Sequence, residues 1–279
     1  MSLWYAICKL FPFAWLHYDF MKNALLVILI LGPLFGILST MIVTGKMSFF
    51  SDALGHSAFT GIAIGVLCGF AAPTWCAMVF AIVFALLFTF VRSRTNLSGD
   101  TVIGVFSSTA VALGIFIATL NGGSFTNFNK YLIGDVLSVQ PSEILVLLLV
   151  LAAVLVFWCL ISNKLVLTAV HPQLASSRGV PVRLHETVFT VLIAVTVTLS
   201  ISRVGLMVVN TLLVLPAAGS RNIARNLRQY LLLSVLSALV CGVAGLITSY
   251  YLSCSAGATV SLYLALYFAV TFCFRKRSA

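Results

Sequence analysis

The sequence predicts an all-α, polytopic membrane protein with eight or nine transmembrane helices. Hydrophobic residues make up 61% of the 279 residues, and Asp, Glu, Lys and Arg together make up only 8%. A soluble domain has roughly 25% charged residues, so this chain has too little polar surface to cover a water-exposed globule. The basic residues lie singly or in short groups between long apolar runs. That pattern indicates membrane topology and not a nucleic-acid-binding patch.

The apolar runs define the expected spans, since a transmembrane helix needs about 20 predominantly apolar residues. The expected spans are residues 24–44, 48–70, 74–91, 101–120, 142–162, 187–202, 204–220, 230–251 and 257–274. The sixth and seventh spans are short, and only Arg203 and Gly205 mark a break between them. We therefore prefer nine crossings. The alternative is eight, in which this pair forms one broken or re-entrant element.

The positions of the basic residues predict the orientation of the chain. Under the nine-span arrangement, twelve of the sixteen fall on one side. They are Lys46, Arg92, Arg94, Lys164, Arg178, Arg183, Arg221, Arg225, Arg228, Arg275, Lys276 and Arg277, against Lys9, Lys22, Lys130 and Arg203 on the other. By the positive-inside rule, the N-terminus is expected outside and the C-terminus in the cytoplasm.

A single transmembrane domain over residues 1–279 is the expected organisation, with three peripheral parts. Trp4, Tyr5 and other aromatic residues predict that residues 1–23 form a segment at the membrane interface. A polar outer loop is expected over Asn121 to Pro141, and a long inner loop over residues 163–186.

Asp52 and His56 are the strongest candidates for a functional site, and they are the only ionisable residues that we place well within a span. They are four residues apart and therefore share one face of a helix. A carboxylate in mid-membrane costs about 2.5–3.5 kcal/mol on insertion scales, so it needs a partner, a cavity or a function. Carboxylate oxygen and imidazole nitrogen suit Zn²⁺, Mn²⁺ or Fe²⁺, and an incomplete ligand set fits an ion in transit. The alternatives are a proton relay and a hydrogen-bonded pair that fastens helices together.

The span that carries Asp52 and His56 and the seventh span have further features of interest. Gly61, Gly65 and Gly69 recur every four residues, which predicts a ridge where a neighbouring helix backbone packs closely. In the seventh span, Asn210 and Thr211 are polar, and Pro216 cannot donate to the carbonyl of Leu212. Broken spans with freed carbonyls line the binding sites of several transporter folds, so these residues are candidates for the transport path. A role of Asn210 in helix packing is the alternative.

Asp135, in the outer loop, is a candidate for attracting a cation at the entrance, with a capping role as the alternative. We find no G-x-x-x-x-G-K-[ST] sequence, no H-E-x-x-H and no G-x-S-x-G. The sequence therefore predicts a transport subunit that is not itself an enzyme and that binds no permanent cofactor.

Four blocks of residues carry a resemblance to a known family. They are GKMSFFSDALGHSAFTGIAIG at 45–65, KYLIGDVLSVQPSEI at 130–144, LASSRGV at 174–180 and VGLMVVNTLLVLPAAGSR at 204–221. In order and spacing, the chain resembles the permease subunits of ATP-binding-cassette (ABC) importers for zinc, manganese and related metals. The block that contains Asp52 and His56 is the most specific of the four.

The resemblance implies a type II-importer-like permease in the cytoplasmic membrane of a prokaryote. It implies a second permease copy, most simply in a homodimer, two cytoplasmic ATPase subunits that bind the ATP, and an extracytoplasmic metal-binding protein. Asp52 and His56 match the metal-coordinating positions of the family. The loop over 168–184 is similar to the coupling helix that docks onto the ATPase, with Leu174, Ala175, Gly179 and Val180 as the residues concerned.

A proton-coupled secondary metal transporter, with Asp52 and His56 as the relay, is the main alternative function. The sequence does not choose between zinc and manganese, because both accept Asp and His ligands, and iron is a third possibility.

Overall fold

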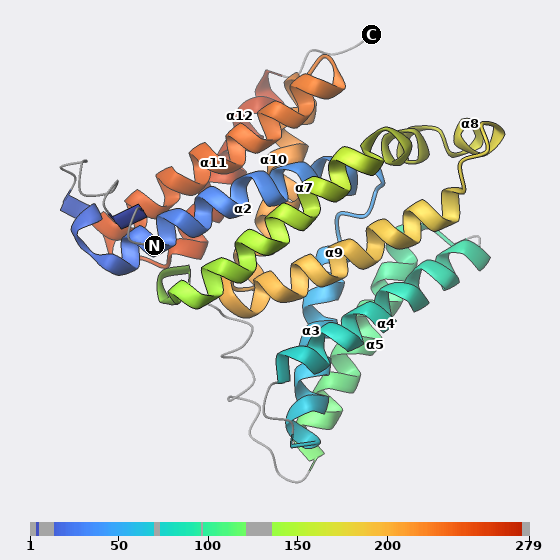
Figure 1. Ribbon diagram of the computed structural model, residues 1–279, viewed down its shortest axis with the longest axis horizontal. Helices are drawn as coiled ribbons and strands as arrows, with labels where there is room; N and C mark the ends of the chain where they lie inside the picture. Colours follow the sequence, from blue (N-terminus) through green and yellow to red (C-terminus); the bar gives the residue numbers. More distant parts are fainter. Residues whose placement is uncertain (1–3, 6–13, 70–72, 96, 121–135, 275–279) are drawn as a thin grey trace. The chain divides into compact units, whose positions relative to one another are not determined.

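The computed structural model describes residues 4–5, 14–69, 73–95, 97–120 and 136–274 (Figure 1). No strand occurs among these residues, as the prediction of an all-α fold requires. In chain order, the helical elements of the described residues are η1 (Ala14–His17), α2 (Asp19–Thr44), α3 (Phe50–Leu67), α4 (Pro73–Arg94), α5 (Gly99–Thr119), η3 (Val136–Ser138), α7 (Pro141–Val170), α8 (Pro172–Ser177), α9 (Val182–Val204), α10 (Leu206–Ile223), α11 (Leu227–Leu252) and α12 (Ala256–Cys273).

In the described part of the chain, nine helices are long and apolar enough to cross a membrane, which confirms the preferred nine spans. The sixth and seventh are separate helices, because α9 ends at Val204 and α10 begins at Leu206. Gly205 stands between them with φ of +96°, a conformation that costs little only for glycine. The eight-span alternative is therefore not supported.

The inner loop is shorter than expected. We expected a loop from residue 163, but α7 continues to Val170, and α8 and the first residues of α9 occupy much of the remainder. Residues 165–170 (LVLTAV) are apolar enough to extend a helix, so hydropathy alone does not mark its end.

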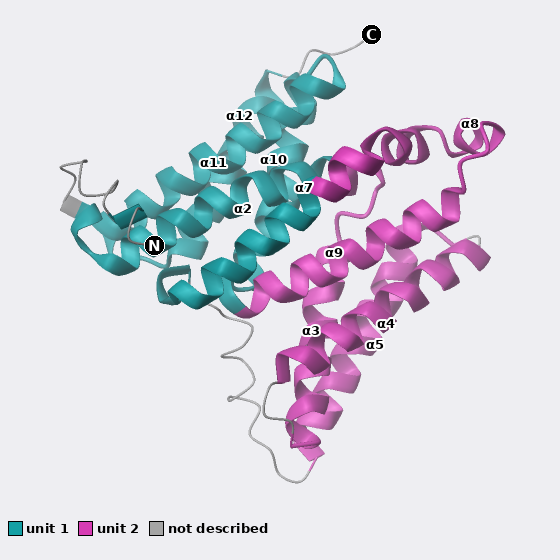
Figure 2. Cartoon of the chain, in the orientation of Figure 1, with its two compact units in different colours: residues 1–40, 135–155, 203–279 teal, residues 41–134, 156–202 magenta. Residues whose placement is uncertain are grey.

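The chain forms two compact units, which Figure 2 shows in different colours. Unit 1 contains residues 1–40, 135–155 and 203–279, and unit 2 contains residues 41–134 and 156–202. Helices α2, α7 and α9 therefore contribute residues to both units. The prediction of one domain over residues 1–279 stays a prediction.

Unit 1 is held together by close helix contacts. A Cβ added at Gly36 of α2 would lie 2.7 Å from the Cα of Val235 of α11, so only glycine allows this approach. Nearby, the hydroxyl groups of Ser39 and Ser234 lie 2.9 Å apart. The hydroxyl of Thr259 on α12 donates to the carbonyl of Gly245 on α11 at 2.8 Å. Small and hydroxyl-bearing residues of this kind are typical of helix packing in membranes.

The start of α2 carries the described part of the N-terminal segment. The indole of Trp4 donates to the carbonyl of Lys22 at 3.0 Å, and the Tyr5 hydroxyl donates to the Asn23 side chain at 2.7 Å. These two aromatic residues thus pack on the first turns of a membrane helix.

Unit 2 is built around α3, which packs against both α4 and α5. The rings of Phe50 and Phe88 have their centres 4.7 Å apart, and Phe106 meets Phe88 edge to face at 6.0 Å. The ends of α2 and α7, with α8 and most of α9, complete this unit.

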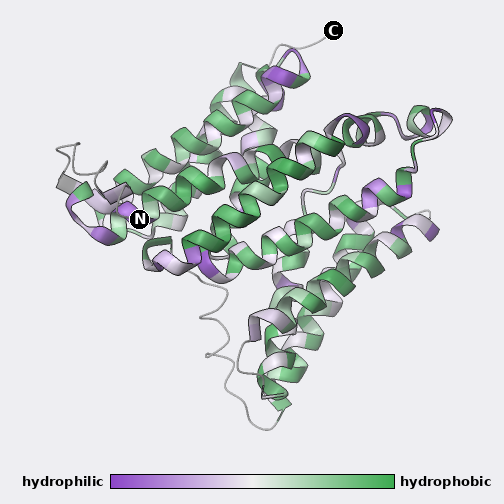
Figure 3. Ribbon diagram, viewed as in Figure 1, coloured by the Kyte–Doolittle hydropathy of each residue, from purple (hydrophilic) through white to green (hydrophobic). Residues whose placement is uncertain are grey.

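Apolar colour runs along most of the helices in Figure 3. Large apolar side chains such as Leu160, Val240 and Leu262 remain exposed on helix surfaces. In water such exposure would be unfavourable, whereas lipid or a neighbouring membrane chain would cover these side chains.

Candidate metal site

Helix α3 begins after a tight turn of Gly45, Lys46 and Met47. The amides of Gly45 and Met47 donate to the carbonyls of Met41 and Ile42 at 2.8 and 2.9 Å. These bonds satisfy carbonyls at the end of α2 that have no partner within the helix. Lys46 adopts φ of +53°, in the left-handed region of backbone conformation, which residues other than Gly, Asn and Asp rarely occupy. The turn therefore fixes where α3 starts.

Asp52 and His56 lie one turn apart on α3, and their side chains meet. The Nε2 atom of His56 is 3.5 Å from Oδ2 of Asp52. That separation is longer than a usual N–H···O hydrogen bond of about 2.7–3.2 Å. It is close to the distance of about 3.4 Å that separates two ligand atoms on a tetrahedral zinc ion with bonds of about 2.0–2.1 Å. The two atoms are therefore spaced to share one metal ion.

Both side chains keep a substantial exposed surface. The exposed fraction is 51% for the Asp52 side chain and 33% for that of His56, whereas Ala53, Leu54 and Ser57 beside them are buried. The pair thus occupies the side of α3 that faces away from its packed surface. Because both residues belong to one helix, their contact does not fasten two helices together.

The helix that carries Asp52 begins later than we expected, and the depth of Asp52 in the membrane stays a prediction. We placed it well within a span that begins at residue 48, but α3 begins at Phe50, so Asp52 lies in the first helical turn. The turn at residues 45–47 is what delays the helix. At this end the partial positive charge of the helix stabilises a carboxylate by about 0.3–1 kcal/mol. This partial charge offsets part of the cost of placing the carboxylate in a membrane.

The opposite side of α3 is shaped by two of the three glycines. A Cβ at Gly61 would lie 2.5 Å from the Cα of Ala77, and one at Gly65 would lie 3.1 Å from Pro73 and Cys76, all on α4. These two positions therefore let α3 and α4 approach closely.

The expectation that Gly69 extends this ridge is wrong. Gly69 follows the end of α3 and has φ of +71°, and no atom of the described residues lies within 4 Å of an added Cβ. Its residue type suits the turn that ends the helix and not a packing contact. Spacing by four residues does not show where a helix stops.

Helix α5 also holds α3 in place. The hydroxyl of Thr60 donates to the carbonyl of Ala110 at 2.6 Å. A Cβ at Gly114 would lie 2.7 Å from the ring of Phe59. With α4 and α5 both packed on α3, the backbone that carries Asp52 and His56 is firmly positioned within unit 2.

The expected coupling residues form α8 and the turn that ends it. Ala175 is buried, and Leu174 is exposed. The amide of Val180 donates to the carbonyl of Ala175, and that of Gly179 donates to Ser176, both at 3.0 Å. With φ of +74° at Gly179, this is the Schellman pattern of a helix end. The motif LASSRGV therefore encodes a short helix with a defined stop.

Asn210, Thr211 and Pro216 lie on α10, in unit 1. We expected a helix broken near Pro216, but α10 continues through it from Leu206 to Ile223. The helices are interrupted at Gly205, where we expected the break between the sixth and seventh spans. The Thr211 hydroxyl donates to the carbonyl of Met207 at 2.6 Å and lies 2.9 Å from the hydroxyl of Ser261. In this arrangement Thr211 links α10 to α12.

Asp135 lies outside the described residues, so its expected role at the entrance stays a prediction. Among the residues that the structure describes, no three of His, Cys, Asp and Glu gather closely enough to hold a metal ion. In this region the Asp52–His56 pair would therefore supply two ligands to an ion, and no third described residue of these types joins them.

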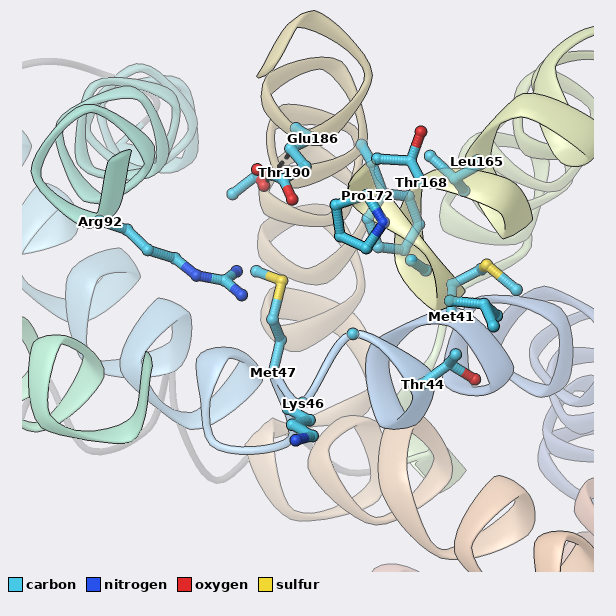
Figure 4. Close-up of a pocket in the computed structure, with 14 residues that line it drawn as sticks. Met41, Thr44, Lys46, Met47, Arg92, Leu165, Thr168, Pro172, Glu186 and Thr190 are labelled. Atoms are coloured by element: carbon cyan, nitrogen blue, oxygen red, sulfur yellow. Dashed lines mark hydrogen bonds between the residues drawn. The ribbon is translucent and has the colours of Figure 1, made fainter. Parts of the chain in front are cut away.

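Sequence reasoning missed a partly enclosed cavity in unit 2, of about 300 Å³ (Figure 4). The ends of five helices and the turn before α3 meet around it. It is lined by Met41, Thr44, Gly45, Lys46, Met47, Arg92, Leu165, Thr168, Ala169, Val170, Pro172, Glu186, Phe189 and Thr190. These residues lie far apart in the sequence and share no motif, so no sequence signal could have found the cavity.

Comparison with known proteins agrees with the fold. The ABC 3 transport family matches residues 17–275. The chain is 31% identical to an uncharacterized membrane protein of Synechocystis, with 94% of this chain and 92% of the relative covered. It is 27% identical to the high-affinity zinc uptake system membrane protein ZnuB of Haemophilus influenzae, over 93% and 99% of the two chains. It is 29% identical to the manganese import system permease protein ScaB of Streptococcus parasanguinis, over 92% and 91%.

Solved structures show the same arrangement of helices. PsaBC from Streptococcus pneumoniae, determined in complex with Fab, matches with a TM-score of 0.77 and 26% identity, over 98% of this chain and 95% of the other. An inward-facing putative metal-chelate type ABC transporter shares the fold, with a TM-score of 0.72, 15% identity, and coverage of 90% and 85%. The family match spans nearly the whole chain, and the chain therefore belongs to the ABC 3 transport family.

Proposed function

We propose that this chain is the permease subunit of an ABC importer that moves a divalent transition metal, zinc or manganese, across the cytoplasmic membrane. The observation that carries the proposal is the Asp52–His56 pair, whose oxygen and nitrogen lie 3.5 Å apart on an exposed side of an otherwise well-packed helix. Relatives named for zinc uptake and for manganese import over nearly the same length support this class of substrate.

The pair suits an ion that must also leave. A closed structural zinc site has four protein ligands, and Asp52 and His56 supply two. The remaining positions are filled by water or by groups from elsewhere in the assembly. A ligand set of this size holds a partly dehydrated ion without trapping it.

The partners follow from the family. A second permease copy, most simply an identical one, encloses the path, an extracytoplasmic protein delivers the metal, and a pair of ATPase subunits binds α8 from the cytoplasm. The exposed Leu174 and the defined helix end at Gly179 support α8 as the docking element. The excess of Lys and Arg on one side supports an external N-terminus and a cytoplasmic C-terminus.

Metal uptake by cells tests this function. In cells that lack their own copy of this chain, the wild type should restore accumulation of radioactive zinc or manganese. We expect Asp52→Ala and His56→Ala each to lower the uptake rate at least about tenfold, because loss of one of two ligands removes a bond that the ion needs. Both variants should still be inserted and should co-purify with the ATPase.

Asp100→Ala is the matched control, since Asp100 is also a carboxylate in the first turn of a helix of unit 2. It should leave uptake unchanged. Normal uptake by both site variants would overturn the assignment of the pair. Uptake that persists when ATP is depleted but stops when the proton gradient is collapsed would support the proton-coupled alternative.

A further inference from the structure

The cavity of unit 2 has a charged part that the proposed transport mechanism does not use. Lys46, whose side chain is exposed, lines it from the turn before α3, and the half-buried Arg92 lines it from the end of α4. In Figure 4 the guanidinium group of Arg92 extends toward Met47 and the middle of the cavity. Glu186 of α9 is the one acidic residue of the lining, so the lining has a net positive charge.

Neither cation is neutralised within the described residues. The ion pairs found there are Lys22–Asp19 and Asp52–His56, and no hydrogen bond from the side chain of Lys46 or Arg92 is present in that part of the chain. The Glu186 carboxylate lies more than 4 Å from both cations, since no ion pair joins them in the described region. Two basic side chains that line a partly enclosed cavity, neither of them in an ion pair with Glu186, favour an anionic ligand.

The rest of the lining is amphipathic. Met41, Leu165 and Phe189 supply an apolar wall. The hydroxyl groups of Thr168 and Thr190 donate to the carbonyls of Lys164 and Glu186, at 2.8 and 2.7 Å. Their protons are therefore used within their own helices, and Lys46 and Arg92 are the cationic donors of the lining. At about 300 Å³ the cavity reaches the lower end of the range of about 300–1,000 Å³ for small-molecule sites.

We propose that this cavity binds a phosphate group, held between Lys46 and Arg92 and carried either by an anionic phospholipid or by a soluble phosphate ester. Arg and Lys are the usual donors to phosphate, and basic pockets between membrane helices at the cytoplasmic side bind lipid headgroups. The apolar wall favours the lipid, whose glycerol and first methylene groups would contact it. A bound phosphate would join the turn before α3 to the end of α4, next to Pro172, the first residue of α8.

Native mass spectrometry of the purified full-length chain in detergent tests the proposal. The lipid probes are dioleoylphosphatidylglycerol and dioleoylglycerol, which has the same acyl chains but no phosphate. We expect wild-type protein to retain the phospholipid and not the diacylglycerol. In Lys46→Gln/Arg92→Gln the affinity should fall about thirtyfold, since each basic side chain near an anionic lipid contributes about fivefold.

Two further variants make the result specific. Arg94→Gln/Lys164→Gln removes two exposed cations that do not line the cavity and should bind as the wild type does. Lys46→Arg/Arg92→Lys keeps both charges and should retain most of the binding. If the two double Gln variants lose binding equally, general surface charge explains it and the cavity assignment is overturned.

Glycerol 3-phosphate, titrated against lipid-free protein, distinguishes the two sources of phosphate. Binding of this ester with the same dependence on Lys46 and Arg92, without retention of the phospholipid, would show that the site takes a soluble ester. Retention of the phospholipid with no effect of the ester would show that it takes a lipid. If neither the phospholipid nor glycerol 3-phosphate bound, the proposal would be overturned.

Discussion

At the scale of single residues, the account depends on one distance. Oδ2 of Asp52 and Nε2 of His56 are 3.5 Å apart, which is long for a hydrogen bond and suitable for two ligands of one ion. The residue types matter as much as the distance. A carboxylate accepts hard ions such as Mn²⁺, while an imidazole suits zinc and several other transition metals.

A change of ligand type should therefore change the choice of metal. In His56→Cys, a soft thiolate replaces the imidazole, and the ratio of zinc uptake to manganese uptake should rise about tenfold. The measurement is competitive uptake of the two radioactive ions by cells that express the variant. Ser57→Cys adds a thiol on the buried side of the same helix and should leave the ratio at the wild-type value. An unchanged ratio in His56→Cys would argue against direct ligation by residue 56.

At the scale of elements, close packing of α3 on α4 holds the pair in place. Gly61 allows this packing, because a Cβ there would lie 2.5 Å from the backbone of Ala77. Gly104 of α5 is a useful contrast, since an added Cβ would meet nothing within 4 Å. Both glycines lie within helices of unit 2.

The two positions should respond in opposite ways to alanine. Gly61→Ala should destabilise the chain by about 1–3 kcal/mol, as overpacking does. Gly104→Ala should be neutral or stabilising by up to about 1 kcal/mol, because alanine favours a helix. The midpoint of thermal unfolding in detergent, monitored by size-exclusion chromatography, measures the change in stability of each variant. Equal shifts in the two variants would contradict the packing of α3 on α4.

At the scale of the whole molecule, hydropathy was enough to predict an all-α membrane protein and all nine spans. The register of Asp52 and His56 on one helical face was also predictable, because spacing by four residues determines it. Helix ends were harder. Because of the turn at residues 45–47, Asp52 lies in the first turn of α3. Gly69 lies in the turn that ends α3, although the four-residue spacing of the glycines predicted that the helix continues through it.

Features made by packing between distant segments could not be predicted. The cavity brings Lys46, Arg92 and Glu186 together from three separate parts of the sequence. Each of these residues by itself resembles an ordinary charge at the end of a membrane helix. Only the fold of unit 2 shows that they surround one cavity.

The most direct test of the central claim is X-ray absorption spectroscopy of zinc bound to the purified chain. The account predicts one imidazole nitrogen at about 2.0–2.1 Å together with oxygen ligands at about 2.0–2.2 Å. The imidazole signal should be absent from His56→Ala, and Asp52→Ala should bind zinc more weakly, while Asp100→Ala should match the wild type. An unchanged imidazole signal in His56→Ala would contradict the account.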